Sequence, residues 1–274
     1  NIEFIPAHVM TPQGIFGSKN PILSIRDYMG DAMDMFSIVE TGLSADPDML
    51  SDIPELDGVN FISNSDCHSP ALNRIGREFT VVDTESADYV SILRSLKDQS
   101  KTFTYEFPPA EGKFFLTGHR KGKKGHEHSA CVFSPDFTPQ DGRCPICGKK
   151  LTIGVYEQLL AICRFQKDVK RKNGKRNNFR ALVPLADVVM NALGNRTMTK
   201  KALQITSSLI SIYGSEIDMW ENFDSSDHIG TDVRILEAVE AVRGNRFSFY
   251  PGYDGEYGKL IIGEQIDYND INEC

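Results

Sequence analysis

The sequence predicts an α/β fold over residues 1–100, followed by a small cysteine- and histidine-containing unit and a mostly helical C-terminal region. The α/β prediction rests on short apolar segments that end in polar residues and on a segment with helical spacing between them. Strands that alternate with helices favour a largely parallel sheet, with its functional site at the carboxyl ends of the strands.

Four strands and one helix are expected in this first region. Residues 2–5, 35–39, 59–63 and 79–82 are rich in branched or aromatic side chains and are the expected strands. Residues 86–99 carry apolar side chains at helical spacing. The polar residues that follow the strands are therefore the first candidates for a site.

The rest of the chain divides into segments of different character. Residues 101–125 lose periodicity and predict a linker, while residues 126–155 hold the cysteine- and histidine-containing unit. Residues 155–166 predict a helix, and residues 182–242 predict several helices with apolar stripes. Between these helical parts, residues 167–180 are strongly basic.

Composition limits the class of protein. The 274 residues carry a formal charge of −8, which argues against a protein that coats phosphate over its whole surface, although local basic patches can still attract nucleic acid. No apolar run reaches the ~18 residues of a membrane span. The six cysteines suit a reducing compartment, and we expect a cytoplasmic protein. The abrupt start at an expected strand leads us to expect a missing N-terminal portion.

Asp66 and His68 follow the expected strand at residues 59–63 and are separated by one residue. At a strand end, side chains two apart point the same way, so the carboxylate and the imidazole can converge. Oxygen and nitrogen donors together suit zinc, manganese or iron in a hydrolytic site. His8 follows residues 2–5 and is a further candidate ligand. A turn aspartate beside a surface histidine is the plainer interpretation of the pair.

A second metal site is predicted from His128-Ser-Ala-Cys131 and Cys144-Pro-Ile-Cys147-Gly. Two ligand pairs, each with two intervening residues, can surround one zinc ion tetrahedrally, and four protein ligands indicate a structural ion. The spacing favours His128 as the first ligand, with His126 and His119 as nearby alternatives.

The basic segment is a candidate phosphate-binding loop. Lys170 and Arg171 lie at its centre, in an otherwise acidic chain, and a second basic cluster lies at residues 120–124. A solvated run of charges is the competing interpretation.

Several motifs resemble a known family. Pro6-Ala-His8 and Ser65-Asp-Cys-His68 resemble metal motifs of PHP-domain phosphoesterases, which are distorted (β/α) barrels with metals at the strand ends. Further motifs occur in the order found in endonuclease Q, a PHP-type DNA repair nuclease with a zinc finger. They are Phe16-Gly-Ser-Lys19, Glu40-Thr-Gly-Leu-Ser-Ala-Asp-Pro47, Ile62-Ser-Asn-Ser-Asp-Cys-His-Ser-Pro70, Cys144-Pro-Ile-Cys-Gly-Lys-Lys-Leu-Thr-Ile-Gly-Val155, Leu182-Val-Pro-Leu185 and Pro251-Gly-Tyr-Asp-Gly-Glu-Tyr-Gly258.

The resemblance implies the C-terminal part of a PHP-type barrel in residues 1–105, a linker and zinc finger in residues 106–155, and a mostly helical DNA-binding region in residues 156–274. It implies cleavage of the phosphodiester 5′ to uracil, hypoxanthine, xanthine or an abasic site. The chain departs from the family by lacking an early His-x-His and by an apparent insertion at residues 121–127.

The resemblance also implies a set of site residues. His8, Asp66 and His68 would be catalytic and would hold two or three divalent metals (Zn²⁺, Mn²⁺ or Mg²⁺), beside the structural Zn²⁺. The expected partner is damaged double- or single-stranded DNA, with a replication clamp as a further candidate and no membrane. The candidate substrate contacts are Lys19, Ser44, Asn64, Lys170 and Arg171.

Some roles stay open at this point. Glu40 could be a ligand, a base-reading group or a strand-end carboxylate, and Ser44 could be an ordinary loop cap. The aromatic segment 251–258 could stack on bases, or dock the C-terminus on the core, which we favour slightly. Another PHP-type hydrolase and a non-catalytic nucleic-acid-binding fragment are the alternative functions.

Overall fold

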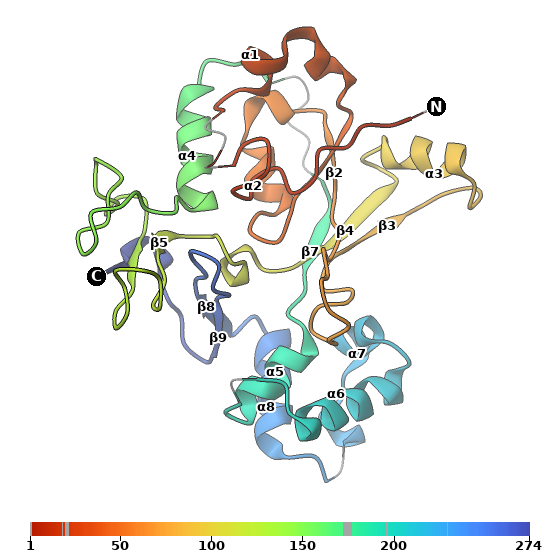
Figure 1. Ribbon diagram of the computed structural model, residues 1–274. Coiled ribbons are helices and arrows are strands. Elements are labelled where there is room, and N and C mark those ends of the chain that lie inside the picture. Colours follow the sequence, from red (N-terminus) through yellow and green to blue (C-terminus); the bar gives the residue numbers. More distant parts are fainter. Residues whose placement is uncertain (1, 18, 20–21, 172–176, 196, 229) are drawn as a thin grey trace.

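The computed structural model describes residues 2–17, 19, 22–171, 177–195, 197–228 and 230–274, and in them helices and strands alternate in a mixed α/β fold (Figure 1). Two lobes are joined by extended segments near the middle of the chain, and a smaller loop-rich unit lies at one side, next to the C-terminus. The α/β class expected from the sequence is therefore confirmed.

The first lobe is built around two short parallel strands, β1 (Ile38–Glu40) and β2 (Asn60–Ile62). Both strands are largely buried, since helices and turns surround them. The surrounding elements are α1 (Ile25–Met29), η1 (Gly30–Met35), α2 (Pro47–Ser51) and η2 (Pro54–Leu56).

Helix α4 (Val155–Phe165) packs against this lobe, although about ninety residues separate it from β2 in the sequence. Val155, Leu159 and Ile162 lie on its buried face at helical spacing. Figure 1 shows α4 beside α2. The packing thus crosses the boundary expected at residue 156.

A three-stranded sheet, in the order β3-β4-β7, connects the two lobes. β3 (Phe79–Val82) and β4 (Thr102–Glu106) are antiparallel, while β4 and β7 (Phe179–Ala181) are parallel. Helix α3 (Tyr89–Leu96) lies in the β3–β4 connection, and Asp88 caps its first turn.

Four helices and a hairpin form the second lobe. Leu185, Val188 and Val189 of α5 lie in the same core as Trp220, the single tryptophan of the chain. The elements are α5 (Leu185–Ala192), α6 (Lys200–Tyr213), α7 (Glu216–Asn222), α8 (Val233–Arg243), β8 (Phe247–Tyr250) and β9 (Lys259–Ile262), with η4 (Ser225–Asp227) before α8. This lobe confirms the helical C-terminal region.

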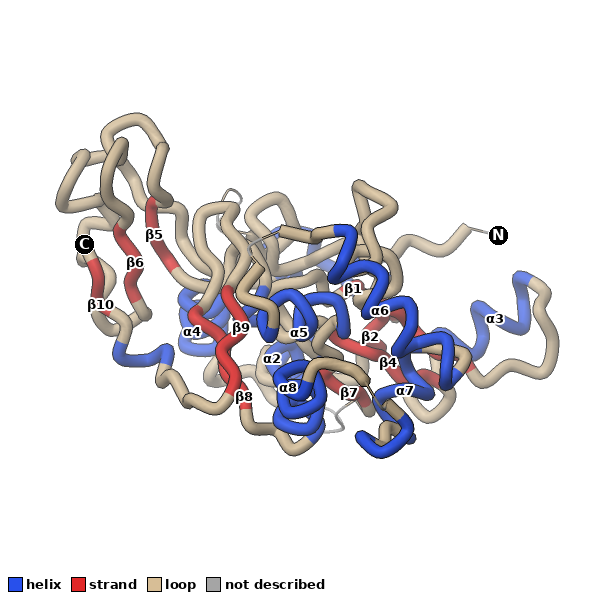
Figure 2. The backbone as a smooth tube through the Cα atoms, turned by 90° about the horizontal axis from the view of Figure 1, so that it is seen from below, coloured by secondary structure: helices blue, strands red, loops and turns tan. Residues whose placement is uncertain are grey.

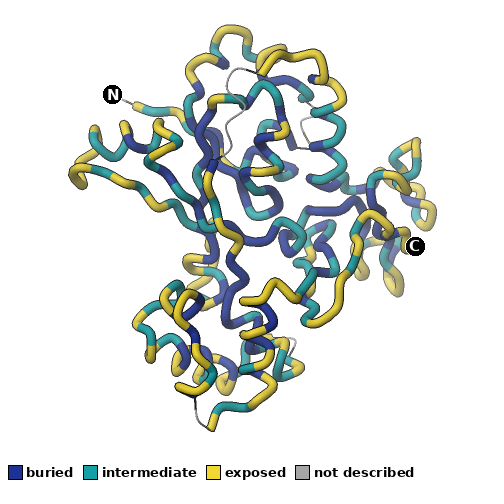
Figure 3. Tube along the Cα trace, turned by 180° about the vertical axis from the view of Figure 1, so that it is seen from behind, coloured by how far each residue is buried: buried dark blue, intermediate teal, exposed yellow. Residues whose placement is uncertain are grey.

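The loop-rich unit contains a small antiparallel sheet of β5 (Thr117–His119), β6 (Cys131–Phe133) and β10 (Asn272–Glu273). Short helical turns η3 (Pro109–Glu111) and η5 (Tyr268–Asp270) flank it. Figure 2 shows this sheet at one end of the molecule, and Figure 3 shows that its loops are more exposed than the centre.

Two expectations about the first region are wrong. Residues 2–5 form no strand, and Ile2 is 96% exposed. Pro6 follows directly and has no N–H to extend a strand ladder, although its carbonyl accepts a hydrogen bond from Glu40 N–H. The expected single, largely parallel sheet is also absent from the described residues, since β1 and β2 pair in parallel while β3 pairs with β4 in antiparallel orientation in a separate sheet.

The described residues contain no helix with the length and apolar character needed to cross a lipid bilayer.

Candidate functional site

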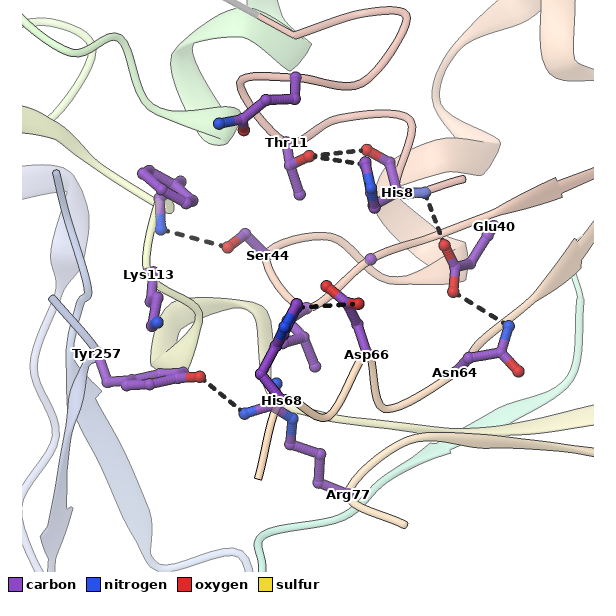
Figure 4. Close-up of a pocket in the computed structure, with 14 residues that line it drawn as sticks. His8, Thr11, Glu40, Ser44, Asn64, Asp66, His68, Arg77, Lys113 and Tyr257 are labelled. Atoms are coloured by element: carbon purple, nitrogen blue, oxygen red, sulfur yellow. Dashed lines mark hydrogen bonds and ion pairs between the residues drawn. The ribbon is translucent and has the colours of Figure 1, made fainter. Parts of the chain in front are cut away.

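One cavity of about 330 Å³ lies where the β1 and β2 strands end. His8, Glu40, Asp66 and His68 line it, Arg77 lies beside His68, and Lys113 and Tyr257 lie on the other side (Figure 4). The structure therefore brings together the three residues that were predicted as catalytic ligands. Asp66 and His68 follow β2 as expected, whereas no strand precedes His8 in the described part of the chain.

His8 is fixed in the cavity wall by its backbone and its ring. Its N–H donates to Glu40 Oε2 at 2.7 Å, and the Thr11 hydroxyl lies 3.0 Å from His8 Nδ1. The backbone of His8 has φ = 35°, which is unfavourable for a residue with a side chain. Backbone strain of this kind is concentrated at functional sites, so it marks His8 for attention.

Asp66 and His68 form an exposed pair. His68 Nε2 lies 3.5 Å from Asp66 Oδ1, and their side chains are 89% and 58% exposed. Asp66 also has a positive φ, of 42°. Among the described residues, the donor atoms of His8, Asp66 and His68 are not gathered within 4.8 Å of one another.

Glu40 supports both sides of this arrangement. It is buried, and besides the His8 N–H it accepts a hydrogen bond from Asn64 Nδ2 at 3.0 Å. Because Asn64 follows β2, Glu40 ties the loop after β2 to the segment that carries His8. The predicted substrate contact Asn64 thus has an internal partner.

A buried carboxyl lies beneath the strand ends. Glu106, the last residue of β4, accepts hydrogen bonds from Ser63 Oγ at 2.5 Å and Thr41 Oγ1 at 3.3 Å. These hydroxyls follow β2 and β1, so Glu106 joins the two segments that lead into the site. Burial raises the pKa of Glu106 to about 7.

Three further residues of the cavity lining were not predicted together from the sequence. Tyr257 OH accepts a hydrogen bond from Arg77 Nη1 at 2.8 Å, and Lys113 Nζ lies 4.6 Å from the Tyr257 ring centroid. Arg77 is 4% exposed, and its Nε donates to the Ser65 carbonyl just before Asp66. We call Arg77, Lys113 and Tyr257 the cationic wall.

Docking of the turn at residues 251–258 brings Tyr257 to this position. Gly252 N–H donates to Ala110 O, Gly255 N–H to Lys113 O, and Gly258 N–H to Glu111 O, all at 2.8–3.0 Å. These hydrogen bonds favour the docking interpretation of this segment over base stacking.

The other predicted substrate contacts lie in varied places. Ser44 lines the cavity but is buried, and its hydroxyl accepts the Phe114 N–H. Lys19 and Lys170 are exposed and are not among the residues that line the cavity. Arg171 donates to Ser51 O and Asp52 O at the end of α2. The neighbouring basic residues 172–176 lie outside the described part.

A second cluster contains the atoms of His119, His126, Cys144 and Cys147, all within 4.8 Å of one another. His126 Nε2 lies 3.1 Å from Cys144 Sγ and 3.4 Å from His119 Nδ1, which is 3.5 Å from Cys147 Sγ. A tetrahedral zinc site with normal bond lengths has ligand–ligand edges of roughly 3.3–3.8 Å. The cluster therefore has the size of a zinc site.

The protonation pattern of the cluster also suits a metal. His119 Nε2 lies 2.9 Å from the Lys150 carbonyl, which favours a proton on Nε2 and leaves Nδ1 free for coordination. Burial lowers the pKa of His119, which favours the neutral imidazole that binds metals.

This cluster differs in two residues from the predicted set of zinc ligands. His128 is exposed and outside the cluster, and Cys131 forms a disulfide with Cys274. Residues 121–127, which the resemblance identified as an apparent insertion, fold back on the unit. A turn at Gly125 (φ = 93°) directs His126 inward. A Cβ on Gly125 would lie 2.8 Å from Cys147 Cβ, so glycine is required there.

Known proteins show a consistent pattern of similarity. No family model matches the chain. An uncharacterised protein of Methanocaldococcus jannaschii, MJ0043, is 31% identical over 83% of this chain and 28% of its own length. YqxK of Bacillus subtilis, also uncharacterised, is 27% identical over 94% of this chain and 60% of its own length.

Two solved structures are similar over 94% of the chain. One is a lesion-specific endonuclease, PfuEndoQ, from Pyrococcus furiosus, with a TM-score of 0.73 and 27% identity. The other is Endonuclease Q in complex with a 27-mer duplex substrate that has an abasic lesion at the active site, with a TM-score of 0.77 and 26% identity. The chain spans 62% of each structure, and so less than two thirds of these relatives.

Proposed function

Because this chain belongs to the endonuclease Q family, we propose that it provides part of a lesion-specific DNA endonuclease. The observation that supports this most directly is its likeness to the Endonuclease Q structure that holds an abasic duplex. The cavity that contains His8, Asp66 and His68 would be the catalytic site. We also propose that the first lobe is the C-terminal part of a PHP-type barrel.

Cleavage would occur at the phosphodiester 5′ to an abasic site or a deaminated base. Taking such a base out of the duplex stack is least costly where its pairing is already damaged. A deaminated base has a carbonyl where the normal base has an amine, so hydrogen-bond donors are needed to recognise it. Asn64 and the backbone N–H groups of residues 42–44 are candidates beside the cavity.

Imidazole and carboxylate donors from separate loops facing one cavity suit divalent metal ions. His8, Asp66 and His68 would hold these ions, and their chemistry would be to generate hydroxide and to neutralise the phosphate oxygens. Two or three ions need more ligands than these three residues. The role of Glu40 would be to hold His8 and Asn64 in place.

The test is cleavage of a labelled duplex containing one abasic site or one uracil, with Mn²⁺, Mg²⁺ or Zn²⁺ and with a chelator. We expect cleavage only with metal, and a loss of at least about a hundredfold in His68→Ala, typical for removal of an essential catalytic group. His128→Ala is the matched control, because His128 is exposed and does not line the cavity. Full activity of His68→Ala would refute the assignment.

We also propose a structural metal ion, expected to be Zn²⁺, at His119, His126, Cys144 and Cys147. The buried Nδ1 of His126 has no hydrogen-bond partner among the described residues, whereas Nε2 faces the thiols, as in a ligand. His126→Ala should lose one equivalent of bound metal by elemental analysis, while His128→Ala should keep it. Loss of metal in His128→Ala alone would contradict this ligand set.

A DNA-binding chain without cleavage is the second candidate. It is favoured by the donors of His8, Asp66 and His68, which are not gathered within ligand distance of one another. Tight lesion binding without product under every metal condition would support this candidate. Hydrolysis of a small sugar phosphate in place of DNA would instead indicate another PHP-type hydrolase.

A further inference from the structure

We propose that the cationic wall of Arg77, Lys113 and Tyr257 binds a phosphodiester group of the substrate strand, in the cavity that His8, Asp66 and His68 also line. This inference rests on the proposed function only in taking DNA as the ligand. It adds three binding residues, of which only Tyr257 lies in a motif noted from the sequence. Figure 4 shows Lys113 and Tyr257 across the cavity from Asp66 and His68.

The wall concentrates positive charge that has no ion-pair partner among the described residues. Arg74 lies 4.2 Å and Lys113 4.6 Å from the centroid of the same Tyr257 ring, and Arg77 lies 5.6 Å from it. Within the described part of the chain, neither Arg77 nor Lys113 has a carboxylate within 4.0 Å. Three cations around one ring repel one another, so an anion that binds between them is stabilised.

The acidic residues behind the wall compensate this charge only weakly. Glu78 and Glu111 are buried and Asp187 is half-buried, and burial raises the pKa of each carboxyl group, which favours its neutral form. A buried carboxyl that keeps its proton does not neutralise Arg77. The wall therefore presents positive charge to the cavity, which Glu40 and Asp66 line elsewhere.

The chemistry of the wall selects a phosphate over a base. The Tyr257 ring already has cations over it, which leaves little of its surface for stacking. Its hydroxyl accepts from Arg77, and no acceptor for the hydroxyl proton occurs in the described residues, so this proton can be donated to a phosphate oxygen. Lys113 adds a mobile ammonium group, and lysine and arginine are the usual phosphate-binding side chains.

The position of the wall is suited to hold the substrate strand. Arg77 Nε donates to the Ser65 carbonyl, one residue before Asp66, so the wall is linked to the loop that carries the proposed ligands. A phosphate bound between Lys113 and Tyr257 would lie in the same cavity as His68. Binding of that phosphate would position the strand for reaction.

The experiment is fluorescence anisotropy of the full chain with an abasic duplex, in a chelator and at several salt concentrations, so that no cleavage is needed. Lys113→Gln should weaken binding about tenfold at low salt, the effect of one charge-assisted hydrogen bond. The slope of log affinity against log salt should fall by about 0.9, the value for one phosphate contact. Tyr257→Phe should weaken binding without changing the slope.

Lys113→Arg, which keeps the charge, should keep the slope, and Lys259→Gln is the control on an exposed lysine outside the cavity. An unchanged slope in a folded Lys113→Gln protein, or no measurable binding by the unaltered chain, would overturn the inference. If the unaltered chain cleaves and Lys113→Gln binds normally, only this inference fails. If the unaltered chain never cleaves but Lys113→Gln shows the expected smaller slope of log affinity against log salt, only the proposed nuclease activity fails.

Discussion

Replacement of Glu106 by glutamine tests how the strand ends beneath the site are held. Glu106 is fully buried and accepts hydrogen bonds from Ser63 and Thr41, which follow β2 and β1. Burial, the main cause, raises the pKa of its carboxyl from 4.5 to about 7. Glutamine has nearly the same shape and can still accept from one hydroxyl, but it cannot ionise.

The size of the effect follows from the two pKa values. Between pH 4.5 and 7 the folded protein keeps a proton on Glu106 that the unfolded chain releases, so the free energy of unfolding falls as the pH rises. The contribution of protonated Glu106 to the free energy of unfolding is fully present below about pH 4.5 and is lost above about pH 7. A difference of about 2.5 pKa units corresponds to about 3 kcal/mol. In Glu106→Gln, which has no ionisable group at this position, the free energy of unfolding should not show this fall between about pH 4.5 and about pH 7.

The assay is urea unfolding at about pH 5 and about pH 8, followed by circular dichroism and by the fluorescence of Trp220. We expect the variant and the unaltered protein to be similar at pH 5, and the variant to be more stable at pH 8 by up to about 3 kcal/mol. Glu264→Gln, at an exposed position, is the control. The same stability difference at both pH values would refute the reasoning, because it would mean that Glu106 does not change its charge in this range.

Three further predictions concern packing and reactivity. Gly258→Ala should lower the free energy of unfolding by about 1–3 kcal/mol in thermal unfolding, because a Cβ there would lie 2.3 Å from Ala110 O. Arg171→Ala should cost about 1–3 kcal/mol in urea unfolding, since two carbonyls at the end of α2 lose their donor. A thiol reagent should modify exposed Cys67 before Cys163, whose pKa is raised by burial, as mapped by mass spectrometry.

Elements whose side-chain pattern is local could be predicted from the sequence. Strand β3 has the predicted bounds, β2 lies within the predicted range, and α4 ends one residue before the prediction, because period-two and helical spacing are properties of neighbouring residues. Asp66 and His68 line the cavity because they follow β2, and His8 joins them because its segment is hydrogen-bonded to the end of β1. The positive φ values of His8 and Asp66 could not be predicted from residue type.

The cationic wall could not be predicted, since its contacts join distant parts of the chain. Arg77 and Tyr257 are separated by 180 positions and meet only because the turn at residues 251–258 docks on residues 110–113. The signal available was the glycine-rich composition of that turn, which allows close backbone approach. The spacing of the ligand pairs favours His128 over His126 as the first zinc ligand. Spacing alone does not show which way a loop folds back, so it could not identify His126.

The turn at residues 251–258 links the histidine–cysteine cluster to the cavity that His8, Asp66 and His68 line. At one end, Asp254 accepts hydrogen bonds from Arg120 N–H and Lys123 Nζ, which lie on the loop between His119 and His126. At the other end, Tyr257 reaches the cavity and contacts Lys113. A metal ion that orders the loop between the two histidines would therefore also order Asp254 and, through the two residues that follow it, the tyrosine of the cationic wall. Because the histidine–cysteine cluster does not line the cavity, its contribution to the site would be made through the position of Tyr257.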